Sequence, residues 1–282
     1  MIGSVAAWRE AAAGLPDEGI PDRADFGELY PWRQVVTHSL TRGHRARVEA
    51  ARRAIATTLE AMCPGGWWWG FSGGKDSSAL GAILAMDGIR VPAVSVKDDL
   101  DYPGESEFVA GLAARWGIRC DILRQSGLAG HLAGTSLVDG SLHSPAASLS
   151  RTYFYRPLAE HRARQGYGGA MLGLRQEESR GRRLNVATRG LLYLRADGLW
   201  VAQPIARLTT LDVHAVLAAA DVPLLPVYLC VDPGAEWQRL RKSWWVCAGG
   251  PARHGHYAWL RRWWPVLWQR AVEIDSEVAA LS

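Results

Sequence analysis

The stretch that decides the fold reads Trp67-Trp68-Trp69-Gly70-Phe71-Ser72-Gly73-Gly74-Lys75-Asp76-Ser77-Ser78. Residues 67–71 form a short apolar run, which is typical of a buried strand. The paired glycines that follow favour a tight turn, and residues 76–86 have the pattern of a helix. This order directs backbone N–H groups and the positive end of a helix dipole toward one point. The stretch therefore predicts an anion-binding turn, with hydroxyl donors from Ser72 and Ser77 and a positive charge from Lys75.

The segments around this turn alternate between strand and helix. Their patterns predict strands over 91–96, 119–123 and 170–174, helices over 45–62, 105–116, 152–165 and 209–220, and a hairpin over 193–202. Such alternation indicates an α/β fold, with a doubly wound, mostly parallel sheet that carries helices on both faces. We expect residues 1–64 to form an irregular segment and a helix, residues 65–235 the sheet domain, and residues 236–282 a C-terminal extension. Residues 127–150 receive no assignment.

The composition is that of an ordinary globular protein, with 48% apolar and 21% charged residues among 282 and a net charge of +4. No apolar run reaches the roughly 18 residues of a transmembrane helix, so a membrane partner is not expected. The start of the chain lacks the pattern of a secretory signal, and the four cysteines form no CxxC pair. We therefore expect a cytoplasmic location. Among 32 basic residues only Lys75, Lys97 and Lys242 are lysine, so a lysine within the turn is unusual for this chain.

Three interpretations of the turn compete. A Walker A loop is excluded, because Trp69 and Asp76 stand where that motif has glycine and Ser or Thr. A nucleophile elbow, GxSxG, fits Gly70, Ser72 and Gly74, and a serine hydrolase using Ser72 remains an alternative that needs a histidine such as His254 or His256. The third interpretation rests on residues 72–77, whose SGGKDS sequence resembles the signature of the PP-loop ATP pyrophosphatase superfamily.

Two further segments resemble one branch of that superfamily, the phosphoadenosine phosphosulfate (PAPS) reductase-like branch. Residues 173–183 are similar to its GxRxEES-R segment, and residues 203–228 to its "PL…WT..DV……P…Y" segment, so that the resemblance spans about 67–247. The chain departs at Leu208, where the branch has tryptophan, and at Cys247, which is all that is left of a cysteine pair. The ECGxH-like tail is missing too. A sulfonucleotide reductase thus stays an alternative only, and no iron–sulfur cluster is expected.

The resemblance implies an activity and a fold. The fold is Rossmann-like, of the adenine nucleotide alpha-hydrolase type, with residues 65–235 as the PP-loop nucleotide-binding domain. The activity is cleavage of ATP into AMP and pyrophosphate, with adenylylation of an acceptor, for sulfur incorporation as in DNA phosphorothioation or another sulfur modification. ATP and Mg²⁺ are the implied cofactors, and the acceptor is a nucleic acid or another molecule. The implied nucleotide contacts are Ser72, Gly73, Gly74, Lys75, Asp76, Ser77 and Ser78.

Several side chains outside the turn complete the predicted site. Asp76 either holds Mg²⁺ or caps the helix. Asp98, Asp99 and Asp101 follow a strand at the sheet edge where ligands bind; they contact ribose or metal, or they form a solvated acidic loop. If residues 175–182 are helical, one face carries Arg175, Glu178, Ser179 and Arg182; the alternative is a solvated charged helix. We predict that Arg175 and Arg182 act in catalysis with Ser72, Lys75 and Asp76, and that Asp98, Asp99 and Glu178 bind nucleotide.

Residues 237–270 hold seven of the fourteen tryptophans and seven basic residues, with no acid. This composition suits stacking on nucleic-acid bases, a partner-protein surface, or a core-facing amphipathic helix with Trp259, Trp263, Val266 and Leu267 on one side. A non-catalytic nucleotide-binding subunit that docks through this end is a further alternative. Cys247 is a sulfur carrier or a small buried residue, and with His254 and His256 it is also a weak candidate for a metal site.

Overall fold

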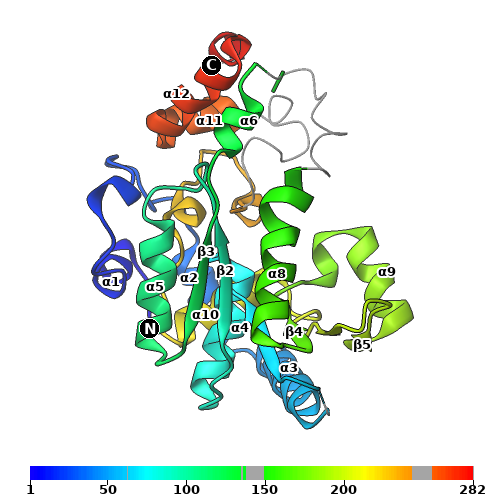
Figure 1. Cartoon of the computed structure of the whole chain (residues 1–282). Helices are drawn as coiled ribbons and strands as arrows, with labels where there is room; N and C mark the ends of the chain where they lie inside the picture. The colour runs from blue at the N-terminus through cyan, green and yellow to red at the C-terminus, as the bar shows by residue number, and fades with distance from the viewer. Residues whose placement is uncertain (62, 135, 138–148, 243–255, 282) are drawn as a thin grey trace.

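The computed structural model describes residues 1–61, 63–134, 136–137, 149–242 and 256–281 (Figure 1). Its centre is a sheet of six strands in the order β3-β2-β1-β4-β6-β5. The strands are β1 (Trp67–Gly70), β2 (Ala93–Lys97), β3 (Cys120–Arg124), β4 (Gly169–Met171), β5 (Leu192–Leu194) and β6 (Trp200–Ala202). All neighbours pair in parallel except β5 and β6, which form the antiparallel hairpin. The predicted α/β class and mostly parallel sheet are confirmed.

The predicted helices are present, and the structure adds helices in the segment expected to be irregular and in the segment that received no assignment. They are α1 (Val5–Ala11), α2 (Trp32–Ser39), α3 (Arg42–Glu60), α4 (Lys75–Met86), α5 (Glu105–Arg115), α6 (Leu128–Leu132), α8 (Arg156–Gln165), α9 (Arg180–Arg189), α10 (Thr210–Ala219), α11 (His256–Trp263) and α12 (Pro265–Ile274). The helix predicted over 152–165 begins as a π-helical turn, Arg151–Tyr155, before α8. The strand predicted over 170–174 already ends at Met171.

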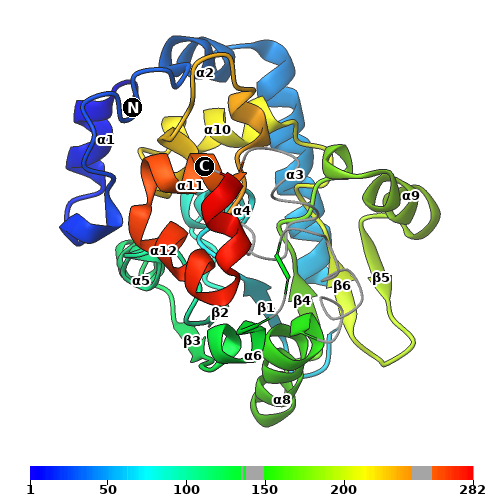
Figure 2. The ribbon, with the colours of Figure 1, turned by 90° about the horizontal axis from the view of Figure 1, so that it is seen from above.

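β1 is buried on both faces, as its apolar sequence requires. Trp69 and Phe71 lie in the larger core, with their ring centroids 4.7 Å apart, and this core also holds side chains of α4, α5 and α10. Trp68 points to the other face, where it belongs to a smaller core with Val94 and Ala170, and Leu158 of α8 packs against it. In Figure 2, α4 and α10 lie on one side of β1 and α8 lies on the other. The helix that follows the turn is therefore held firmly inside the molecule.

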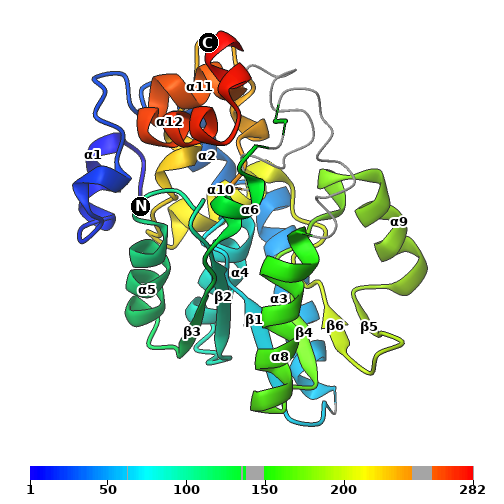
Figure 3. The ribbon, with the colours of Figure 1, turned by 45° about the horizontal axis from the view of Figure 1, so that its top comes forward.

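The C-terminal helices lie beyond the carboxyl edge of the sheet, beside α6, whereas α9 and β5 project to the side (Figures 1 and 3). One amphipathic helix with Trp259, Trp263, Val266 and Leu267 on a single face is a wrong prediction. The chain ends α11 at Trp263 and starts α12 at Pro265, because proline suits the first turn of a helix and not its interior. Val266 is 71% exposed, whereas Trp263 and Leu267 are buried as predicted. Cys247 and His254 lie outside the described residues.

None of the helices in the described ranges combines the length and the apolar character that crossing a membrane would require.

Candidate phosphate-binding site

The turn after β1 has the geometry that its glycines predict. Gly73 has a φ of +81°, a conformation that side chains disfavour, and a Cβ atom there would lie 3.1 Å from Val109 Cγ2. Gly74 is the N-cap of α4 and offers no capping side chain to the first turn of the helix. The turn lies at the carboxyl end of β1, so the start of α4 presents its dipole at the edge where ligands bind in such sheets.

Three serines hold the backbone of the turn. Ser72 Oγ accepts a hydrogen bond from Gly74 N (3.2 Å) and lies 3.1 Å from Ser77 Oγ. Ser77 Oγ donates to Gly74 O (2.9 Å), and Ser78 Oγ donates to Gly73 O (3.4 Å). The loop is therefore preorganised before any ligand arrives. Within the described residues no histidine bonds Ser72, and His256 stacks on Trp259 with ring centroids 5.4 Å apart, so the hydrolase alternative gains no support.

Lys75 is an almost fully buried cation, with 3% of its surface exposed. Its Nζ lies 3.3 Å from Asp76 Oδ2 and 5.1 Å from the centre of the Tyr228 ring. Tyr228 Oη also accepts a hydrogen bond from Lys75 N at 3.1 Å, which satisfies one of the open N–H groups of α4. Burial lowers the pKa of Lys75, and the negative charge of Asp76 opposes this shift only in part. An anionic ligand would place further negative charge beside the ammonium of Lys75 and so favour its protonated form.

Arg175 links the end of β4 to the first turn of α4. It is 1% exposed, its Nε bonds Asp76, and its Nη2 donates to Thr210 Oγ1 at 3.1 Å. Burial alone would raise the pKa of Asp76, but the charges of Lys75 and Arg175 outweigh burial and hold it below its usual value. The structure thus brings together three predicted site residues, Lys75, Asp76 and Arg175. Mg²⁺ on Asp76 stays a prediction; in the structure each oxygen of this carboxylate lies against one of these two cations.

Residues 175–182 do not form the single helix that the spacing suggested. Residues Gln176–Glu178 form a 3-10 turn, and Ser179 is extended, with φ −162° and ψ 156°. Ser179 breaks the helix because its Oγ accepts a hydrogen bond from Arg182 N (3.1 Å) and so caps the separate helix α9. Arg182 nevertheless ion-pairs with Glu178, whose carboxylate also accepts from Arg175 N at 3.2 Å.

The three aspartates after β2 have different surroundings. Asp99 caps α6, because its carboxylate accepts hydrogen bonds from the N–H groups of residues 127–129 at 3.1–3.3 Å. Asp98 Oδ1 accepts from Leu100 N at 2.9 Å within its own loop. Asp101 Oδ1 lies 3.5 Å from Lys242 Nζ, beside the turn. Asp101 thus contacts a residue beside Gly74, whereas Asp99 is occupied in the helix cap.

The sequence reasoning missed four charged residues at this site. Lys97 Nζ donates to Ser72 O at 2.9 Å and ion-pairs with Glu105. Lys242 Nζ lies 2.5 Å from the same Glu105 oxygen, and Arg241 Nη1 lies 2.7 Å from Glu178 Oε1. The signal that would have found two of them is composition: all three lysines of this arginine-rich chain lie at this turn. Lys97 is 2% exposed and the Lys242 side chain 13%.

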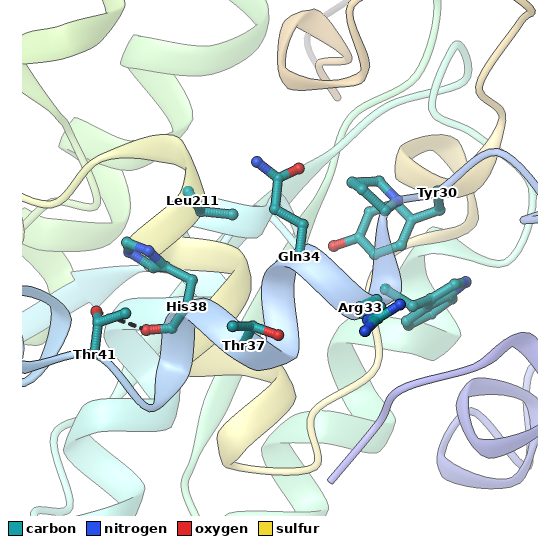
Figure 4. A pocket seen from close by; sticks show the side chains of 9 residues that line it. Tyr30, Arg33, Gln34, Thr37, His38, Thr41 and Leu211 are labelled. Atoms are coloured by element: carbon teal, nitrogen blue, oxygen red, sulfur yellow. Dashed lines mark hydrogen bonds between the residues drawn. The ribbon is translucent and has the colours of Figure 1, made fainter.

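A second charged cluster lies away from the turn, around Asp212 of α10. Its carboxylate lies 2.8 Å from His38 Nε2 and 3.1 Å from His44 Nδ1, and it accepts from Arg47 Nε at 2.5 Å. Figure 4 shows His38 with Thr37 and Leu211 at a pocket on the outer side of α2. In the described residues this is the group of His, Cys, Asp and Glu with metal-ligand spacing. However, Arg47 occupies both carboxylate oxygens, so the cluster serves as an ion pair between helices.

The comparisons with known proteins concern the fold. Neither a scan against protein-family models nor a search of curated proteins found a match. The chain is similar to a PAPS reductase from Candida auris in a phosphate complex, with 14% identity over 69% of this chain and 89% of that chain and a TM-score of 0.49. It is also similar to an NMN synthetase from Francisella tularensis (16% identity, 64% and 70%, TM-score 0.40). A third similar structure is the U34-tRNA thiolase NcsA from Methanococcus maripaludis with its [4Fe-4S] cluster (13% identity, 84% and 79%, TM-score 0.44).

All three TM-scores lie below 0.5, so the functional argument is made from the residues of this chain.

Proposed function

We propose that this chain is a PP-loop ATP pyrophosphatase of the PAPS reductase-like branch, with a doubly wound, Rossmann-like sheet. It cleaves ATP into AMP and pyrophosphate and transfers the adenylyl group to an acceptor. One observation carries the proposal: the SGGKDS turn sets a helix start with glycine at its N-cap and the buried ammonium of Lys75 around one point at the carboxyl edge of the sheet. Such a point suits the phosphate groups of a nucleotide.

The residues that the reaction needs follow from where negative charge develops, which is on the leaving pyrophosphate. An acceptor oxygen attacks the α-phosphorus, the bond to the bridging oxygen breaks, and its electron pair leaves with pyrophosphate. The protein therefore needs donors and cations at the β- and γ-phosphates. The amides of Gly73 and Gly74, the hydroxyls of Ser72 and Ser77, and the ammonium of Lys75 supply them. Mg²⁺ arrives with ATP as part of the substrate.

The remaining predicted residues position these donors. Asp76 holds Lys75 and Arg175 through its carboxylate. Glu178 holds Arg182 in the same manner. Arg175 and Arg182 then add positive charge toward the leaving pyrophosphate. Sulfur incorporation into the acceptor is the purpose that the sequence resemblance implies, with a nucleic acid as one candidate acceptor and the cytoplasm as the expected location.

The test combines turnover and binding. Protein incubated with Mg²⁺ and ATP labelled on the α-phosphate is expected to release pyrophosphate and transfer the label to the acceptor once an acceptor is present, with AMP released when a second nucleophile displaces it from the acceptor. Formation of ADP and orthophosphate would contradict the proposal. Binding of α,β-methylene ATP by calorimetry needs no acceptor. It is expected for the native chain and weakened at least tenfold in Lys75→Met, with Arg53→Met, a 67% exposed position, as the control. Absence of binding by the native chain would also contradict the proposal.

A further inference from the structure

The charged side chains around the turn are arranged in a repeated pattern. Three carboxylates each bond two cations: Asp76 bonds Lys75 and Arg175, Glu105 bonds Lys97 and Lys242, and Glu178 bonds Arg182 and Arg241. All three carboxylates are at least 85% buried, so each needs a cation beside it. None of them needs two. Removing one cation from any of these groups would leave the carboxylate paired with the other.

In two of these groups the second cation is fixed by further bonds to the fold. Arg175 also donates to Thr210 Oγ1, and Lys97 also donates to Ser72 O. Arg175 and Lys97 therefore stay with their carboxylates when the partner cation leaves. Among the described residues, the Nζ atoms of the partners Lys75 and Lys242 ion-pair only with acidic groups, and Lys75 Nζ in addition lies over the Tyr228 ring.

Arg241 and Lys242 are consecutive, and together they cross the start of α4. Lys242 reaches Glu105 on α5, and Arg241 reaches Glu178 in the 3-10 turn after β4. A Cβ atom added to Gly74 would lie 3.9 Å from Lys242 Cβ, which places this side chain directly beside the turn. The two cations thus lie on either side of the helix start that the phosphates would approach.

We propose that Arg241 and Lys242 are further ligands of the β- and γ-phosphates of ATP, which exchange Glu178 and Glu105 for phosphate oxygens when the nucleotide binds. This inference rests on the proposed function. The exchange leaves Glu105 with Lys97 and Glu178 with Arg182. Asp101, which also lies 3.5 Å from Lys242, keeps the hydrogen bond that Asp98 N donates to its carboxylate. The polyphosphate carries more negative charge than either carboxylate, and charge-assisted hydrogen bonds to it are strong.

The pKa shifts fit this exchange. Burial raises the pKa of Glu105, even though the charges of Lys242 and Lys97 act against the shift. Burial would lower the pKa of Lys242, but the charges of Glu105 and Asp101 outweigh it and raise this pKa. Lys242 therefore keeps its proton at neutral pH and offers a full positive charge to a phosphate.

The experiment separates a phosphate ligand from a structural residue. Calorimetry measures the affinity of the native chain and of Lys242→Met, Arg241→Met and Lys242→Arg for three probes: α,β-methylene ATP, inorganic pyrophosphate and AMP. Each methionine variant is expected to lose at least tenfold in affinity for the first two probes and less than twofold for AMP. Lys242→Arg is expected to recover most of the loss. Arg239→Met is the matched control, since Arg239 lies two residues away, is 77% exposed and pairs with Glu236.

Two outcomes would overturn the inference. Unchanged pyrophosphate affinity in both methionine variants, with a native chain that binds ATP, would remove Arg241 and Lys242 from the site and leave the proposed function intact. An equal loss for AMP and pyrophosphate, with a lower melting temperature, would make the residues structural. Failure of the native chain to bind either ATP or pyrophosphate would instead overturn the proposed function.

Discussion

This molecule has two clusters of buried charged residues, one around Asp212 and one at the turn after β1, and they differ in how their carboxylates are paired. At Asp212 both carboxylate oxygens accept hydrogen bonds from the chain itself, from His38, His44, Arg47 and Thr209. At the turn after β1, each carboxylate holds two cations beside a helix start whose N-cap residue, Gly74, has no side chain. The first cluster is saturated and ties α2 and α3 to α10. The second has cations to spare and an open helix end, which is what an anionic ligand requires.

The largest expected effect tests the saturated cluster. Asp212→Ala leaves Arg47 and two histidines without their partner, and breaking a buried pair of this kind costs about 3–5 kcal/mol in the free energy of unfolding. Urea denaturation measures this loss, with Asp197→Ala, at a half-exposed surface position, as the control. The affinity of the folded variant for ATP is expected to stay unchanged. A loss below about 1 kcal/mol would mean that Asp212 does not hold the helices together.

The next prediction tests the charged cluster at the turn after β1. Here the rate of the reaction is expected to fall while the stability of the fold is kept. Lys75→Met removes a preorganised cation, so the rate of pyrophosphate release is expected to fall by about 10²–10³-fold. The free energy of unfolding is expected to hold or rise, because methionine is less costly to bury than an ammonium. Pyrophosphate release and urea denaturation measure the two quantities. A rate within tenfold of the native one would show that the turn does not stabilise the leaving group.

A smaller effect tests how the turn is held in place. A Cβ atom at Gly173 would lie 2.9 Å from both Ser77 N and Ser77 Cα, so Gly173→Ala forces β4 away from the first turn of α4. Overpacking of this kind costs about 1–3 kcal/mol. The affinity for ATP is expected to fall with it. Gly181→Ala is the control, since its nearest neighbour would be 4.0 Å away; equal effects of the two variants would contradict this packing.

The last prediction is a pH dependence from His214 of α10, which lies beside Tyr30 and Tyr228. Burial lowers the pKa of His214 to about 3, so the folded chain keeps this residue neutral while the unfolded chain protonates it below about pH 6.5. The unfolded state thus binds more protons between these values, and the free energy of unfolding rises with pH by up to about 1.4 kcal/mol per unit. Urea denaturation between pH 4.5 and 6.5 is expected to show a shallower slope in His214→Gln. An unchanged slope would assign the dependence to other groups.

The sequence was informative where the signal is local. The tryptophan strand, the glycine turn and the helix after it lie within 20 residues and need no distant partner, and the structure has all three. The start of α10 was also readable, because Thr209 accepts from Asp212 N and caps the helix. Local propensity and capping chemistry decide such elements.

The sequence failed where a tertiary contact decides. No local feature of the sequence shows that Ser179 caps a new helix, because residues 175–182 are equally compatible with a single continuous helix. Glu105 and Lys242 meet only after the chain has folded, so their spacing carries no signal. The scarcity of lysine was visible from the start. It identified Lys75 but was not extended to Lys97 and Lys242, which lie at the same site.

One measurement decides whether the turn binds the pyrophosphate end of a nucleotide: a crystal structure of the chain with α,β-methylene ATP and Mg²⁺. The β- and γ-phosphates are expected against the amides of Gly73 and Gly74, with Lys75 Nζ in contact and the α-phosphorus facing open solvent. A turn without phosphate, or a nucleotide bound elsewhere on the chain, would contradict the proposed function.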